Sequence, residues 1–314
     1  MFEKSSPISR IFEIFSYGED IFSFPGIKMK KSNFLFGTVG SPKSTPKKPG
    51  GSVGAIYQLR SLGLDSFELG WVRSVRVSES TCMDIKSVAQ ELNIVLSVHA
   101  PYFINLNADD EEWPKSRKRL MDAAHYGYLA GATDIVFHPG SYFGREPEDV
   151  LPVAISRLQT CVKELREKNN IVTLRPETMG KSAMLGSLQD VLAISAEIDG
   201  VEPCMDFPHL FARSGDGSMN TYVEWKDCLL EYGSSLGEAS LQRLHIHLSG
   251  IEFGPKGEKK HLCIEESELD INAVLSALRD MNCSGRILCE SPILEEDALL
   301  IQKKWNKLIK NEKA

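Results

Sequence analysis

Six short apolar runs of this chain each end in a side chain that can bind a metal ion. The runs are IVLSVH, DIVFH, IVTLRPE, VEPCMD, LHIH and RILCE, and they end at His99, His138, Glu177, Asp206, His247 and Glu290. In a parallel barrel, the carboxyl ends of all strands point to one side, and the active site lies there. Six such strands would bring their ligands to one place, which predicts a parallel barrel with a metal site at that end.

Strand-like and helix-like stretches alternate from residue 33 onward. Helices are predicted near 52–62, 78–92, 115–131, from about 147, and near 187–198, 219–233, 270–282 and 294–311. Alternation calls for parallel strands, and eight βα units of this size close naturally into a (β/α)8 TIM barrel. An open doubly wound sheet is the alternative. Its site lies at one switch point, however, and GTVGSP after the first strand lacks the GxGxxG spacing of a nucleotide site.

One catalytic domain accounts for most of the chain. With 314 residues, of which 42% are hydrophobic and 25% charged, the chain can bury a large core. α/β barrels of this length commonly form a single domain, and we expect the barrel over residues 29–314. Residues 1–28 precede the first strand-like run. We expect a weakly ordered N-terminal extension there, with a partner-binding arm as the alternative.

Charge and cysteine content favour a cytoplasmic enzyme. The formal net charge of −7 argues against a protein that coats nucleic acid, although a local basic rim can still surround one cleft. The seven cysteines form no CxxC pair and are odd in number, which is typical of reduced thiols. No apolar stretch approaches the roughly 20 residues of a membrane span, so we expect no membrane partner.

Two further histidines follow the strand ends. His209 comes three residues after Asp206, and His261 lies in the long loop GPKGEKKHLCIEES. Imidazole and carboxylate ligands together suit zinc or manganese, and several carboxylates can hold more than one cation by bridging. His245 shares one side of its strand with His247, so we expect it in the core or in support of a ligand.

The ligand set is compatible with two kinds of chemistry. Several cations in one cleft favour phosphodiester hydrolysis, because one can activate water while others neutralise the phosphate. Glu177 and Glu290 are then the predicted catalytic groups, since they can bridge the cations or balance their charge. With one divalent ion, the same barrel supports aldose–ketose isomerisation or epimerisation, and the fold alone does not choose between these reactions.

From about residue 33 to 305, the chain resembles the endonuclease IV family of apurinic/apyrimidinic endonucleases. The most specific segment is SVHAPYFINL, and VFHPGS, PETMG, CMDFPH, HLS and ILCESP follow in the family's order. The resemblance implies up to three zinc ions, with Glu177 bridging the first two. The implied ligands are His99, His138 and Glu177 for the first ion, Glu177, Asp206, His247 and Glu290 for the second, and His209 and His261 for the third.

The chain departs from the family's pattern at the third ion. The family has an Asp two residues before the last His, where this chain has Lys259. The adjacent Glu258 could supply the oxygen if the loop shifts by one residue. The first strand also lacks a His near its end, and HLSG replaces an HLND-like segment. These differences indicate a divergent branch.

The resemblance further implies cleavage of double-stranded DNA on the 5′ side of abasic sites. We expect a monomer, because a duplex must reach the barrel mouth unobstructed. Tyr102 matches the aromatic residue that contacts DNA at the lesion, and Arg73 and Arg76 lie on the loop that enters the duplex. The first and seventh loops add a basic rim. Its lysines are Lys43, Lys47, Lys48, Lys256, Lys259 and Lys260.

Two rival functions remain open. One is a sugar or sugar-phosphate isomerase or epimerase with a single divalent ion. Its ligands would be Glu177, Asp206, His247 and Glu290. The other is a DNA-binding barrel that recognises lesions without cutting them, because it has lost the third ion.

Overall fold

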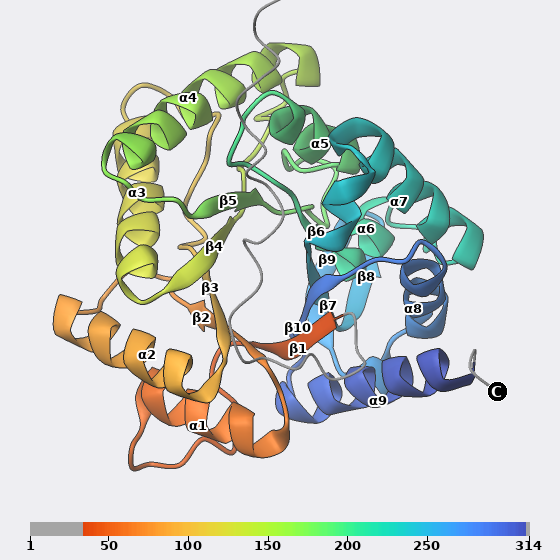
Figure 1. Ribbon diagram of the computed structural model, residues 1–314. Coiled ribbons are helices and arrows are strands. Elements are labelled where there is room, and N and C mark those ends of the chain that lie inside the picture. Colours follow the sequence, from red (N-terminus) through yellow and green to blue (C-terminus); the bar gives the residue numbers. More distant parts are fainter. Residues whose placement is uncertain (1–33, 312–314) are drawn as a thin grey trace, which may run out of the picture. The chain divides into compact units, whose positions relative to one another are not determined.

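The computed structural model describes residues 34–311, and they form a barrel of parallel strands ringed by helices (Figure 1). Its strands are β1 (Phe34–Val39), β2 (Ser66–Gly70), β3 (Val95–His99), β4 (Ala132–Phe137), β5 (Thr173–Pro176), β6 (Cys204–Asp206), β7 (Leu244–Leu248) and β10 (Gly285–Cys289). They pair in the order β5-β4-β3-β2-β1-β10-β7-β6, and two isolated parallel bridges join β5 to the segment around β6. The (β/α)8 prediction is confirmed. The predicted extension over residues 1–28 lies outside the described residues.

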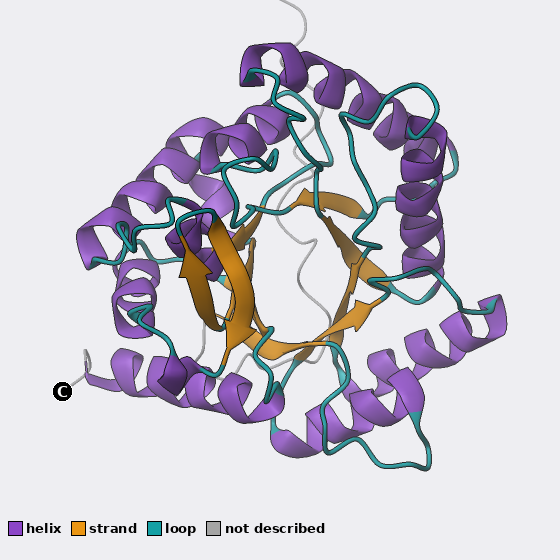
Figure 2. Cartoon of the chain, turned by 180° about the vertical axis from the view of Figure 1, so that it is seen from behind, coloured by secondary structure: helices purple, strands orange, loops and turns teal. Residues whose placement is uncertain are grey.

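The helices form the outer ring, as Figure 2 shows from the opposite side. They are α1 (Gly51–Leu62), α2 (Glu79–Leu92), α3 (Trp113–Leu129), α4 (Pro147–Glu167), α5 (Leu188–Ala196), α7 (Tyr222–Leu236), α8 (Ile271–Asp280) and α9 (Glu295–Asn311). Each begins close to its predicted position, and those with a predicted end also end close to it. Capping boxes start α5 at Ser187 and α7 at Thr221. Among the described residues, no helix is both long enough and apolar enough to span a membrane.

Two features at the carboxyl end of the barrel strands were not predicted. The segment expected as a long loop after β7 is an antiparallel hairpin of β8 (Gly250–Gly254) and β9 (Gly257–Leu262). A short helix, α6 (Phe207–Arg213), follows β6 directly, and the Asp206 side chain caps it by accepting a hydrogen bond from the His209 amide at 2.6 Å. Short 3-10 turns lie at Glu238–Gln242 and Ile264–Glu266.

The barrel interior is charged in its amino-terminal half. Asp134 on β4 lies 2.5 Å from Arg175 Nε on β5 and 2.7 Å from Arg286 Nη2 on β10. Arg175 also pairs with Glu202 at 3.1 Å. Asp134 and both arginines are buried, so these ion pairs tie together strands on different sides of the barrel below the predicted site.

Candidate metal centre

The ends of the barrel strands, together with α6 and the β8–β9 hairpin, bring all nine predicted ligands together. Within residues 34–311, they fall into three groups, and in each group the potential ligand atoms lie within 4.8 Å of one another. The groups are His99, His138 and Glu177; Glu177, Asp206, His247 and Glu290; and His209, Glu258 and His261. These are the sets that the resemblance implied, with Glu258 in the place of the family's Asp.

Glu177 stands at the centre of the first two groups. It follows β5 directly and is fully buried. Its Oε2 lies 3.3 Å from Nε2 of both His99 and His138, while its Oε1 lies 3.1 Å from Nδ1 of His247. Because each carboxylate oxygen faces a different set of histidines, the side chain is placed to bridge two cations.

The second group converges on His247 Nδ1. This atom lies 3.7 Å from Glu290 Oε1 and 4.0 Å from Asp206 Oδ2. Cap formation at α6 uses Asp206 Oδ1, and Oδ2 has no hydrogen-bond partner in the described part of the chain. Glu177 Oε2 is likewise buried without a hydrogen bond. Buried carboxylate oxygens that accept no hydrogen bond are costly, so these residues fit a bound cation.

The protonation pattern also reflects an excess of buried carboxylates. Burial raises the pKa of Asp206 well above its usual range, and the charges of Glu177 and Glu290 raise it further. Burial alone would raise the pKa of Glu177, yet the surrounding histidines hold it well below its usual range. Burial alone would lower the pKa of His99, but Glu177 raises it to about 9. The charges of the histidines and of the carboxylates thus set one another's pKa, and a bound cation would add to this balance.

The third group depends on a bulge in the hairpin. Glu252 pairs with Lys260 and Phe253 pairs with Glu258, so Lys259 is an extra residue in β9. A bulge shifts the alternation of side chains by one position. Glu258 therefore shares the inner side of the hairpin with His261, and its Oε2 lies 3.5 Å from His209 Nε2. The one-residue shift considered for this segment is thus present as a bulge.

The two lysines at the bulge point away from this group. Lys259 Nζ and Lys260 Nζ lie 3.1 and 3.4 Å from the carboxylate of Glu252 on the outer side of the hairpin. Part of the predicted basic rim is therefore neutralised by a neighbouring acid. The lysine at the family's Asp position consequently places no positive charge among the ligands.

Close backbone contact anchors the hairpin beside β5. The Glu258 amide donates to the Gly180 carbonyl at 2.8 Å. Gly257 has a φ of +92°, and a Cβ there would lie 2.2 Å from the same carbonyl oxygen, so only glycine fits. Arg213 of α6 donates to the carbonyls of Met179 and Lys181, which fixes the loop that carries Gly180. Backbone contacts thus set the position of Glu258.

One buried acid of the site was not predicted. Glu68 lies inside β2 in the sequence FEL and is fully buried. It makes a 2.9 Å hydrogen bond with His245 Nε2, and its Oε1 lies 3.1 Å from His247 Nε2. A charged residue in the middle of a buried strand could have indicated its role. The pattern of six apolar runs missed it, because that pattern uses only the residues at strand ends. His245 is in the core, as expected.

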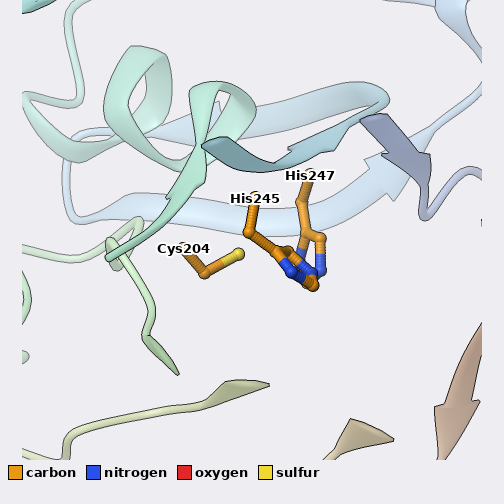
Figure 3. A group of neighbouring side chains, drawn as sticks. All are labelled: Cys204, His245 and His247. Atoms are coloured by element: carbon orange, nitrogen blue, oxygen red, sulfur yellow. The ribbon is translucent and has the colours of Figure 1, made fainter. Parts of the chain in front are cut away.

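Cys204 adds a thiol below the ligands. Its Sγ and ring nitrogens of His245 and His247 lie within 4.8 Å of one another, and Figure 3 shows the sulfur directed toward the two rings. Burial raises the pKa of the Cys204 thiol, which disfavours a thiolate. All seven cysteines are free, as the sequence predicted.

The residues predicted to contact DNA lie at the barrel mouth. Tyr102 is 49% exposed and stacks on His138 with ring centroids 5.0 Å apart. Its amide donates to the Val72 carbonyl at 2.9 Å, which ties its loop to the loop that carries Arg73 and Arg76. Arg73 and Arg76 are both exposed. Phe103, which was not predicted, is also exposed there.

Comparison with known proteins agrees with the fold. The family model described as "Xylose isomerase-like TIM barrel" matches residues 56–309. An uncharacterized protein of Methanocaldococcus jannaschii, MJ0133, is 38% identical over 87% of this chain and 97% of its own length. Endonuclease 4 of Thermus thermophilus is 28% identical over 53% of this chain. That match spans 61% of the endonuclease, less than two thirds of its length.

Solved structures include both a nuclease and a protein related to sugar epimerases. Endonuclease IV from Thermus thermophilus superposes with a TM-score of 0.66 at 20% identity, over 87% of this chain and 99% of that chain. A D-tagatose 3-epimerase-like protein superposes with a TM-score of 0.65 at 17% identity, over 88% of this chain and 100% of that chain. At these identities the likeness shows the shared barrel, and the site must distinguish the chemistries.

Proposed function

The chain belongs to the xylose isomerase-like TIM barrel family, and we propose that it is a metal-dependent phosphodiesterase that cuts DNA on the 5′ side of abasic sites. The group of His209, Glu258 and His261 carries this proposal. A single-metal isomerase needs only one set of ligands, whereas this chain adds a second and a third set at the same barrel end. Several cations in one cleft are the requirement of phosphodiester hydrolysis.

His209, Glu258 and His261 would hold the third ion, and a set of four would hold the second, namely Glu177, Asp206, His247 and Glu290. Glu177, shared by two groups, would hold the first and second ions together, and Glu290 would close the second group from the partly exposed side. Zinc, with manganese possible in part, would supply a nucleophilic water and neutralise charge on the phosphate. Glu177 and Glu290 are therefore the proposed catalytic residues.

Burial of the site explains why the substrate would be a flipped nucleotide. Glu177, Asp206 and His247 are fully buried, so a phosphate inside a regular duplex cannot reach them. An abasic sugar turned out of the helix can enter a pocket, and the missing base lowers the cost of unstacking. Tyr102 at the mouth would contact the lesion. Arg73 would contact the phosphate backbone, where arginines commonly position a protein on DNA.

We also propose that the protein acts as a cytoplasmic monomer on double-stranded DNA. The free cysteines are compatible with a reducing compartment. A duplex must reach the strand ends, so we infer that the barrel mouth is not covered by a second copy.

Single-turnover cleavage of a labelled duplex with one abasic-site analogue tests the proposal. Protein reconstituted with zinc should cut 5′ to the analogue and leave the intact duplex uncut. His209→Ala should lose the cleavage, whereas His125→Ala, at an exposed histidine on α3, should keep it. A metal-bound protein that does not cut would overturn the proposal.

Sugar epimerisation is the second candidate, favoured by the group of Glu177, Asp206, His247 and Glu290. These four residues are a complete ligand set for one divalent ion. Under this function, His209→Ala would leave activity on a ketose unchanged. The same pair of histidine variants therefore separates the two functions.

A further inference from the structure

Glu68 crosses the barrel interior to reach a ligand strand. Its own strand, β2, is separated from β7 by β1 and β10 in the sheet order. The side chain nevertheless lies 2.9 Å from His245 Nε2 and 3.1 Å from His247 Nε2, both on β7. All three side chains are fully buried, so bulk water does not reach their polar atoms.

The two oxygens of Glu68 have different surroundings. Oε2 accepts a hydrogen bond from Ser97 Oγ at 2.6 Å and bonds His245 Nε2. Oε1 has no hydrogen-bond partner in residues 34–311, and the same holds for His247 Nε2, 3.1 Å away. The two atoms are therefore placed to partner each other.

The other nitrogen of His247 faces the ligands of the second group. Nδ1 lies 3.1 Å from Glu177 Oε1 and 3.7 Å from Glu290 Oε1. A neutral imidazole binds a metal through the nitrogen that lacks a proton, and the proton sits on the other one. A carboxylate that accepts this proton fixes the tautomer and the ring orientation and makes the ligand more basic.

We propose that Glu68 is a positioning residue that holds the Nε2 proton of His247 and thereby directs Nδ1 to the metal. Ser97 and His245 hold Glu68 in place by occupying its second oxygen. The inference rests on the metal centre of the proposed function, and it applies equally if that centre holds one ion or three.

The same atoms allow a competing explanation. Cys204 Sγ, His245 and His247 could hold a separate metal ion below the others. In that case His247 Nε2 would bind metal and could not donate to Glu68. The two explanations differ in the proton on Nε2 and in the effect of removing Cys204.

Metal binding to three variants separates them. Zinc affinity is measured by competition with a chromogenic chelator, and metal content by mass spectrometry. Glu68→Leu removes the acceptor at similar size, and we expect it to lower affinity at the His247 site by about 10–100-fold. Glu68→Gln keeps one acceptor oxygen for His247 and should lose less than Glu68→Leu. Cys204→Ala, the matched control in the same cluster, should bind the same number of ions with wild-type affinity.

Three results would overturn the role of Glu68. They are wild-type affinity in folded Glu68→Leu, an equal loss in Glu68→Gln and Glu68→Leu, and loss of one ion in Cys204→Ala. Nitrogen NMR of zinc-bound wild-type protein gives an answer even if the variants do not fold. It should show His247 protonated at Nε2, and metal at Nε2 would contradict the proposal. Zinc binding without DNA cleavage, by contrast, would count against the proposed function and leave Glu68 unaffected.

Discussion

Two buried sets of charges lie at opposite ends of the barrel, and they are balanced in different ways. In the amino-terminal half, Asp134 is matched by Arg175 and Arg286. At the carboxyl end, Glu177 and Asp206 form ion pairs only with histidines, and one oxygen of each has no hydrogen bond within the described chain. The amino-terminal set, called the lower set below, is neutralised by side chains of the chain itself. The set at the carboxyl end, called the upper set, has buried carboxylate oxygens that are suited to bind a cation. One therefore serves stability and the other is suited to function.

The largest effect should follow from removing a carboxylate of the upper set. Glu290→Gln should reduce cleavage of abasic DNA by about 10³-fold or more, because it removes several kcal/mol of charge stabilisation. The thermal midpoint of the metal-free protein should not fall, since the change relieves repulsion among carboxylates. Single-turnover kinetics measure the cleavage rate, and thermal melting measures the midpoint of the metal-free protein. Retained activity would refute Glu290 as a ligand.

The matching change in the lower set should act on stability instead. Asp134→Asn leaves two buried arginines with one partner fewer, and we expect a loss of about 3–5 kcal/mol in the free energy of unfolding. Cleavage by the folded fraction should persist. Denaturant unfolding at pH 7 measures the loss, and a change below about 1 kcal/mol would contradict the view that this set is structural.

The stabilisation from Asp134 should also depend on pH with a defined sign. Burial would raise the pKa of Asp134, but Arg286 and Arg175 hold it well below its usual range. A lowered folded-state pKa stabilises the protein above the unfolded value of about 3.9, and the effect is lost as pH falls toward the folded value. The difference between wild type and Asp134→Asn should be constant from about pH 5 to 8 and shrink below about pH 4. A difference that grows in acid would contradict this assignment.

Zinc should stabilise the wild-type protein through the upper set alone. At a free concentration of about 100 times the dissociation constant, one ion contributes about 2.7 kcal/mol to the free energy of unfolding. The same increment should appear in Asp134→Asn and be smaller in Glu290→Gln. Melting with and without chelator measures it. Equal increments in all three proteins would place the ion elsewhere.

The sequence predicted which side chains of the upper set come together, because their placement at strand ends is local. Asp206 and His247 each end an apolar run, and the end of a parallel strand has a fixed location in a barrel. Glu68 could not be predicted in this way, since its role depends on reaching across from β2 to β7. The bulge at Lys259 depends on how two strands pair, which the order of residues does not specify.

The smallest effect should come from deleting the residue that makes the upper set unusual. In a regular hairpin, residues two positions apart share a side, so deletion of Lys259 would leave Glu258 two residues before His261 and still facing it. Metal content should be unchanged, and cleavage should stay within about threefold of wild type, less than about 1 kcal/mol. Glu258→Gln is the contrasting variant and should lose one ion. If the deletion variant also loses that ion, the bulge does more than put Glu258 on the same side of the hairpin as His261. In that case Lys259, or the twist that the bulge imposes, takes part in shaping the third group.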